Sequence, residues 1–270
     1  MNSLRQKQKQ LLSELSKQLN ELESHPLEAV HQARKITKFM RALLKLDASI
    51  PPEVKTALKA ISRILAPYRD AQVNIETHEL LLLDSNTPSE PELDELLRNN
   101  PFHQHPAPDS DQLQQLDQHL LQLEKEFGIS RPEPDDLLSP IKGTYKSGRK
   151  ALLRAATKPT SESLHAWRKK TKRLWYQLRF IYGESPLPPL PPLPPHHPVN
   201  TSDHLGKSLG EIHDLDVLNL LIHSQATPKL LALMNTKRLT LLQQALEAAE
   251  KLFDQNPSTF SHQYLEIKNH

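Results

Sequence analysis

Residues 30–44, VHQARKITKFMRALL, combine an apolar helical pattern with a row of cations. At 100° per residue, the apolar side chains gather on one side, which we expect to face a core. These are Ile36, Phe39, Met40, Leu43 and Leu44. The cations gather within about 80° on the other side, and they are His31, Arg34, Lys38, Arg41 and Lys45, with Lys35 beside them. Because no Asp or Glu occurs from Val30 to Leu46, we expect that the anion that balances these cations is supplied from outside this helix.

The same pattern returns in the second half of the chain, within LHAWRKKTKRLWYQLRF at 164–180. His31-x-x-Arg34-Lys35-x-x-Lys38 is repeated as His165-x-x-Arg168-Lys169-x-x-Lys172. Later in each half, a Leu is followed by an Asp and a Val at the same spacing: Leu65, Asp70 and Val73, then Leu209, Asp214 and Val217. Self-similarity of this kind indicates internal duplication. We therefore expect one domain over 1–270 made of two helical repeats, 1–130 and 131–270, packed about a pseudo-two-fold axis.

Composition and periodicity predict an all-α fold. Leu, Ala, Lys, Glu and Gln dominate the periodic segments, aromatic content is 5%, and no segment alternates like a strand. The expected helices cover 3–23, 26–46, 51–66, 69–84, 110–127, 135–157, 160–182, 200–210, 212–225 and 228–254. Prolines at 26, 51, 52, 159 and 228 sit where a first helical turn tolerates them.

Two proline-rich stretches are expected to connect these helices. Residues 85–108 read as an irregular, acidic connection. Residues 184–199, ESPLPPLPPLPPHHPV, predict polyproline II. This second stretch fits a loop spacer better than a ligand for a proline-recognition domain.

Several classes of protein are disfavoured by simple features of the chain. It has no cysteine, so disulfides and thiolate–metal sites are excluded, and MNSLRQKQKQ lacks the apolar region of a signal peptide. No apolar run reaches the ~18 residues that a membrane span needs. We therefore expect an intracellular, cytoplasmic protein that does not enter a membrane.

Charge is distributed unevenly, although the net charge is only +2. Residues 76–141 hold fifteen acidic and three basic residues, whereas residues 142–183 hold twelve basic residues and one acid, Glu162. Further basic rows accompany the first one. They comprise Lys55, Lys59 and Arg63; Lys146, Arg149, Lys150 and Arg154; and His165, Arg168, Lys172 and Arg179 with Lys169 and Arg173 beside them. Arg69 immediately precedes the first repeated aspartate.

Like charges at helical spacing repel, by roughly 0.2–0.5 kcal/mol for each exposed pair. A single basic row can be an ordinary solvated face, but four rows, two of them repeated, favour an anionic ligand. His31 and His165 either contact that anion or simply pack between helices. Asp70 and Asp214 are expected to be structural, as N-terminal helix caps or as partners that orient a cation.

Sequence signals for catalysis are weak. HLGKSLG contains the GKS of a P-loop, but residue 201 is Thr where that motif needs Gly. GxGxxG, HExxH and GxSxG are absent, and the fourteen histidines do not adopt metal-ligand spacing. We therefore expect no catalytic residues, no bound metal and no cofactor.

Taken in order, five motifs make the chain resemble the CHAD family, the conserved histidine α-helical domain. They are VHQARKITKFMRALL, YRDAQV, YKSGRKALLRA, LHAWRKKTKRLWYQLRF and LGEIHDLDV. The resemblance extends from about residue 5 to about residue 255. It implies two pseudo-symmetric helical bundles around a basic channel that binds inorganic polyphosphate. It also implies a binding module rather than an enzyme, found beside polyphosphate metabolism or on polyphosphate granules.

The resemblance assigns polyphosphate binding to the repeated motifs and to the helix before the second one. The full set of candidates adds the neighbouring basic rows, Arg69, and Lys207 as the repeat counterpart of Arg63. Two departures weaken strict symmetry of the site. Arg69 is replaced by His213 in the second copy, and Lys55 and Lys59 have no basic counterpart there.

The chemistry of the basic rows agrees with such a ligand, because polyphosphate offers dense negative charge and no bases. Arg suits bidentate phosphate contact, while Lys acts as a mobile point charge. Few aromatic residues accompany the rows, whereas binders of single-stranded nucleic acid use aromatics as stacking platforms. A nucleic-acid-binding helical protein and an enzyme that processes phosphate chains stay open as alternatives.

Overall fold

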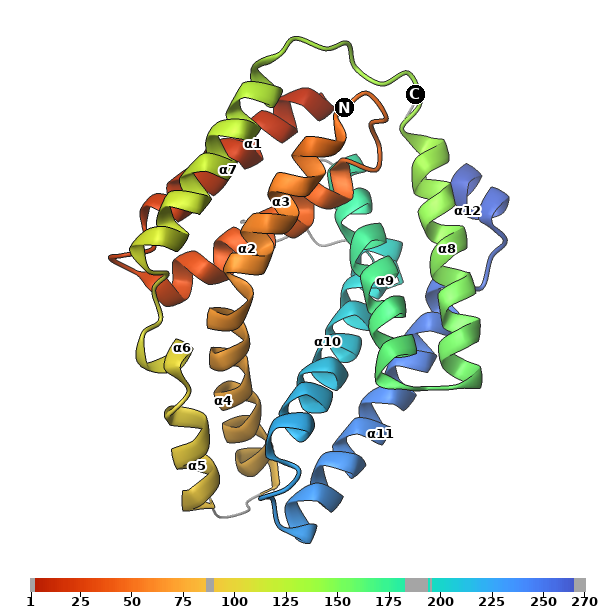
Figure 1. Cartoon of the computed structure of the whole chain (residues 1–270). Helices are drawn as coiled ribbons and strands as arrows, with labels where there is room; N and C mark the ends of the chain where they lie inside the picture. The colour runs from red at the N-terminus through yellow and green to blue at the C-terminus, as the bar shows by residue number, and fades with distance from the viewer. Residues whose placement is uncertain (1–2, 86–89, 183–193, 195, 265–270) are drawn as a thin grey trace. The chain divides into compact units, whose positions relative to one another are not determined.

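A computed structural model of the chain describes residues 3–85, 90–182, 194 and 196–264. Within these ranges the fold is all-α, as predicted, and contains no strand (Figure 1). The helices are α1 (Leu4–Asn20), α2 (Pro26–Leu43), α3 (Pro52–Ile64), α4 (Ala66–Ser85), α5 (Pro91–Arg98), α6 (Pro101–Gln104), α7 (Ser110–Gly128), α8 (Leu138–Thr157), α9 (Ser161–Ile181), α10 (Pro198–Ile222), α11 (Pro228–Leu252) and α12 (Pro257–Tyr264). The predicted proline-rich spacer at 184–199 falls largely outside the described residues.

Local sequence determines where many of these helices begin. Pro26, Pro52 and Pro228 each occupy the first helical position, where the missing N–H costs nothing. Helix α7 starts with a capping box, in which the Asp109 carboxylate accepts from the backbone N–H of Gln112 at 2.8 Å. These signals explain why most predicted boundaries lie close to the observed ones.

Two expectations about the helices were wrong. Residues 85–108 were predicted to be irregular, yet they contain α5 and α6, whose prolines Pro91 and Pro101 are the first residues of these helices. The expected break between 210 and 212 does not occur, because α10 continues through Gly206 and Gly210. Both glycines lie inside α10 and against side chains of α9, so neither ends the helix.

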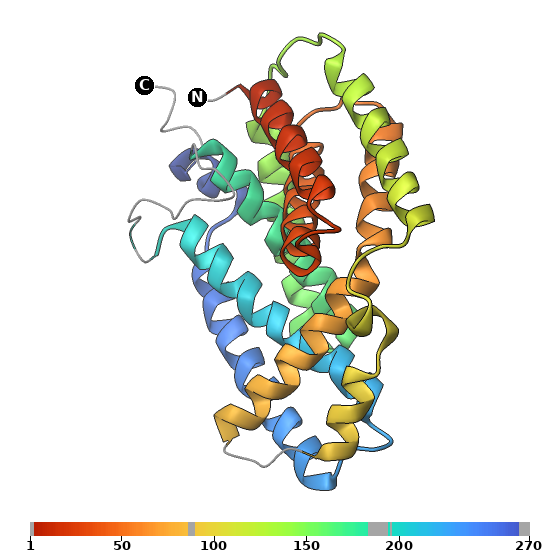
Figure 2. The ribbon, with the colours of Figure 1, turned by 90° about the vertical axis from the view of Figure 1, so that its left-hand side faces the viewer.

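The chain divides into two compact units, the first comprising residues 1–75 and 95–137. In this unit α1, α2, α3 and α7 form a closed bundle, since α1 packs on α2, α2 on α3, α3 on α7 and α7 on α1 (Figures 1 and 2). Its core is largely aliphatic, and Phe39 in the C-terminal half of α2 is fully buried in it. Ile36 and Met40 are buried beside it, as the apolar pattern predicts.

The second unit comprises residues 76–94 and 138–270. Here α9 packs between α8 and α10, and α10 runs beside α11 along most of its length (Figures 1 and 2). Trp167 on α9 is fully buried, and Tyr145 on α8 stacks on Phe260 of α12 with ring centroids 3.9 Å apart. The short segment 76–94 is tied to the rest of this unit by polar contacts. Lys237 pairs with Asp84 at 2.7 Å, and Glu90 bonds Thr227.

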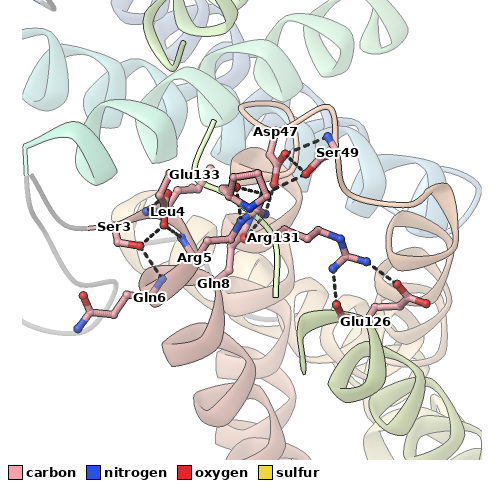
Figure 3. A network of polar contacts seen from close by, with 11 residues as sticks. Ser3, Leu4, Arg5, Gln6, Gln8, Asp47, Ser49, Glu126, Arg131 and Glu133 are labelled. Atoms are coloured by element: carbon pink, nitrogen blue, oxygen red, sulfur yellow. Dashed lines mark hydrogen bonds and ion pairs between the residues drawn. The ribbon is translucent and has the colours of Figure 1, made fainter. Parts of the chain in front are cut away.

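A polar network closes one end of the first unit (Figure 3). The carboxylate of Glu133 accepts hydrogen bonds from the backbone N–H groups of Leu4 and Arg5, at 3.1 and 3.2 Å, and from Ser3. It thereby satisfies N–H groups that lack partners within α1 and places negative charge at the positive end of the helix. Arg5 pairs with the buried Asp47 and donates to the Pro132 carbonyl at 2.9 Å. These contacts attach residues 130–133, which follow α7, to the start of α1.

No helix in the described part of the chain is long and apolar enough to cross a membrane.

Candidate functional site

In the first unit, the predicted basic residues lie on α2, α3 and the start of α4. Lys38 and Arg41 on α2 and all three cations of α3, Lys55, Lys59 and Arg63, are exposed. The remaining residues of this set are half-buried: His31, Arg34, Lys35 and Arg69. Lys45 does not extend the α2 row as predicted, because the helix ends at Leu43; it is exposed in the following turn.

Arg34 is held in place by neighbouring helices. Its side chain is 16% exposed, Nη1 donates to the carbonyl of Ser62 at 3.0 Å, and Nη2 lies 3.7 Å from Asp70 Oδ1. The Ser62 carbonyl belongs to the last turn of α3, where carbonyl groups lack intrahelical partners. Arg34 therefore satisfies the end of α3 and offers only part of its guanidinium group to a ligand.

The two repeated aspartates are not N-terminal caps. Asp70 lies inside α4 and Asp214 lies in the middle of α10, so that alternative was wrong. For Asp70, the contact with Arg34 fits the other expectation, a carboxylate that orients a cation.

His31 is half-buried beside this arginine. Burial lowers the pKa of His31, and the positive charges of Arg69 and Lys35 lower it further. A histidine in this position is neutral at pH 7, and a bound anion would favour its protonated form.

In the second unit, α9 crosses α10 at two glycines. A Cβ added to Gly206 would lie 2.9 Å from Lys172 Cδ and Cε, and one added to Gly210 would lie 3.5 Å from a guanidinium nitrogen of Arg168. Gly206 therefore gives the side chain of Lys172 room to cross the surface of α10, whereas Arg168 lies at ordinary contact distance from Gly210. Both glycines are buried, and Arg168 and Lys172 are half-buried.

His165 contacts His213, which immediately precedes Asp214 as Arg69 precedes Asp70. Their ring centroids are 4.4 Å apart, and Nδ1 of His165 is buried without a hydrogen-bond partner among the described residues. Burial lowers the pKa of His165, with Lys169 and Arg168 adding to the effect. Burial also lowers the pKa of His213, to about 4, and the nearby charges of Arg168 and His165 contribute.

Lys172, Lys207 and Arg179 are part of a mixed cluster with Trp175 and Asp203. Asp203 accepts from Lys172 at 3.3 Å and pairs with Lys207 at 2.9 Å. Lys172 Nζ lies 4.2 Å from the centroid of the Trp175 ring, and the guanidinium of Arg179 lies 4.9 Å from it. Only 7% of Arg179 is exposed, and its guanidinium packs on this ring.

The other predicted residues of this unit lie at or near the surface. Lys169 on α9 is exposed and Arg173 is half-buried. On α8, Lys146, Lys150 and Arg154 are exposed and Arg149 is half-buried. Helix α8 packs directly against α9, so both basic helices belong to the same unit.

Sequence reasoning missed Trp175, Asp203 and the two glycines. The spacing of Gly206 and Gly210, four residues apart on one helix face, is a detectable signal for close approach of another element. Asp203 also stands four residues before Lys207, a spacing that predicts an ion pair on a helix.

The lowered pKa values of the three histidines predict a pH-dependent stability. Between pH 6.5 and about 4, His213 is protonated in the unfolded chain but stays neutral in the folded one. The free energy of unfolding therefore falls as pH decreases through this window. His31 and His165 act in the same direction. Urea unfolding from pH 7.5 to 5 should show this loss, and His213→Gln should show a shallower one. An unchanged pH slope in His213→Gln would contradict the assignment.

The chain is therefore an all-α protein whose basic residues gather on α2–α3 and on α9–α10. Comparison with protein families identifies its family: the CHAD domain matches residues 8–223, most of the chain. The chain belongs to the CHAD domain family. Neither the curated proteins nor the solved structures contain a significant match to it.

Proposed function

We propose that the chain is a binding module for inorganic polyphosphate and performs no catalysis of its own. The observation that carries the proposal is the set of exposed cations on α2 and α3. Arg41, Lys55, Lys59 and Arg63 are exposed, and none makes an ion pair with an acidic side chain among the described residues. Such a face repels itself until an anion binds. Membership of the CHAD domain family supports the same ligand.

The proposal includes internal duplication. Repeat-equivalent residues meet in both units: His31 is close enough to Arg69 to be affected by its charge, and His165 contacts His213. Arg69 and His213 each precede their copy's aspartate by one residue. These parallel contacts support two copies of one helical unit. The family resemblance adds the proposal that both copies bind one polyphosphate chain in a common basic channel.

Polyphosphate suits these faces better than nucleic acid does. Phosphate groups without bases require many cations and no stacking surface. One aromatic ring, Trp175, lies beside basic residues of α9, and Lys172 and Arg179 already lie over it. We therefore expect preference for polyphosphate over RNA, a cytoplasmic protein, and association with polyphosphate granules where these form.

A salt-titrated competition tests the proposal. Fluorescently labelled long-chain polyphosphate is bound to the full chain and displaced by unlabelled polyphosphate or by single-stranded RNA of equal charge. Polyphosphate should compete better at every ionic strength, and its affinity should fall steeply and linearly on a log–log plot against salt. Equal competition by RNA would favour the nucleic-acid alternative. Release of orthophosphate on incubation with Mg²⁺ would favour the enzyme alternative.

A further inference from the structure

The basic face of the second unit carries its own anion. The two oxygens of Asp203 are divided between two lysines, with Oδ1 3.3 Å from Lys172 Nζ and Oδ2 2.9 Å from Lys207 Nζ. The Asp203 side chain is only 19% exposed, so the carboxylate lies between the two ammonium groups rather than beside them in solvent. A phosphate group approaching these lysines meets a position that a carboxylate already occupies.

The backbone of α10 makes this arrangement possible. Lys172 crosses α10 at Gly206, where a Cβ would lie 2.9 Å from its Cδ and Cε. The repeat-equivalent residue of the first copy is Ser62, since both residues stand eight positions before their aspartate. Lys38, the equivalent of Lys172, is exposed. The glycine is therefore the local feature that allows Lys172 to lie down toward Asp203.

The corresponding positions of the first unit carry no such anion. Lys59 and Asp203 each stand eleven residues before their copy's aspartate, and Arg41 and Trp175 each stand ten residues after their copy's histidine. Where the second unit has Trp175, Asp203 and Lys207, the first therefore has three exposed cations: Arg41, Lys59 and Arg63. All three positions are therefore positive in the first copy, whereas in the second the negative charge of Asp203 balances the positive charge of Lys207.

From this difference we propose that the two copies bind polyphosphate unequally, with the α2–α3 face as the stronger site and Asp203 as an internal competitor on the α9–α10 face. The inference rests on the proposed function. Phosphate binding at Lys172 and Lys207 must break two ion pairs, whereas binding at Lys59 and Arg63 breaks none among the described residues. Asp203 thus lowers the polyphosphate affinity of the α9–α10 face, so that this face is occupied only at a higher local density of phosphate groups.

Substitution of Asp203 tests the inference through a gain of affinity. Asp203→Asn keeps the size of the side chain and removes its charge, and it should raise polyphosphate affinity about three- to tenfold at low salt. Asp203→Lys introduces the residue type found at Lys59. It should raise affinity more than Asp203→Asn and increase the slope of log affinity against log salt by the amount expected for about one additional phosphate contact. Glu250→Gln and Glu250→Lys are matched controls, because Glu250 is exposed on α11 of the same unit. They should change affinity far less than the Asp203 variants.

The outcomes separate the inference from the proposed function. If the wild-type chain binds no polyphosphate, both are overturned. If the wild type binds, but Asp203→Asn and Glu250→Gln change affinity equally, only net charge matters and the inference alone is overturned. Loss of affinity in Asp203→Asn with unchanged helix content would also overturn it, since Asp203 would then be orienting the lysines for the ligand.

Discussion

Replacement of Arg41, Lys59 and Arg63 by glutamine is expected to weaken polyphosphate binding by about two orders of magnitude, because three phosphate contacts are lost together. The magnitude of the slope of log affinity against log salt should fall by about 2, because binding with three fewer phosphate contacts releases fewer counterions. All three side chains are exposed on α2 and α3, so circular dichroism and thermal unfolding should stay close to wild type. Fluorescence anisotropy with labelled polyphosphate at several salt concentrations measures both effects.

A matched control removes the same charge elsewhere in the first unit. Lys9, Lys17 and Lys125 lie on α1 and α7, outside the proposed face, and all three are exposed. Their replacement by glutamine should lower affinity by less than about threefold, through net charge alone. Equal losses in the two triple variants would mean that polyphosphate binds without a defined face. An unaffected Arg41/Lys59/Arg63 variant would show that these residues form only a solvated surface.

Trp167→Ala is expected to have the largest effect on stability, about 3–5 kcal/mol in the free energy of unfolding. Trp167 is fully buried in the N-terminal half of α9, and its removal leaves a cavity that the surrounding helices close only in part. It directly precedes Arg168, so loosening of this turn should also reduce polyphosphate affinity. Thermal unfolding of the second unit should shift downward by roughly 10 °C.

The second tryptophan of α9 provides the comparison. Trp175 is half-buried, with Lys172 and Arg179 over its ring, so Trp175→Ala removes surface contacts rather than core volume. We expect a loss of about 1 kcal/mol, mainly from the cation–π contacts. Chemical unfolding followed by circular dichroism would measure both variants. A larger loss for Trp175→Ala than for Trp167→Ala would contradict the packing described for α9.

The sequence predicted the helices well wherever a local signal marked them. Pro26, Pro52 and Pro228 identify helix starts because proline tolerates the first turn, and that rule depends on no distant contact. The same rule applied to Pro91 and Pro101 would have found α5 and α6, which acidic and proline-rich composition obscured. The expected break at 210–212 was wrong in the opposite direction, because a glycine inside a helix cannot be distinguished by composition from one that ends a helix.

Periodicity likewise placed the cations on common helix faces but could not predict how they are used. Arg34 and Arg168 belong to the same repeated motif as the exposed Lys38, yet the first bonds the end of α3 and the second lies over Gly210. Arg179 packs on the ring of Trp175, and the balance of charge at Lys172 depends on Asp203. These contacts join residues on different helices or turns, so spacing within one helix does not determine them.

The order of segments within the second unit has a practical consequence for dissecting the protein. Residues 76–94 belong to this unit but occur in the chain between two parts of the first. Cutting the polypeptide once after residue 137 would separate Asp84 from Lys237 and Glu90 from Thr227. Two cuts flanking 76–94 are needed as well, so a recombinant second unit has to join this segment to residues 138–270 through a new linker.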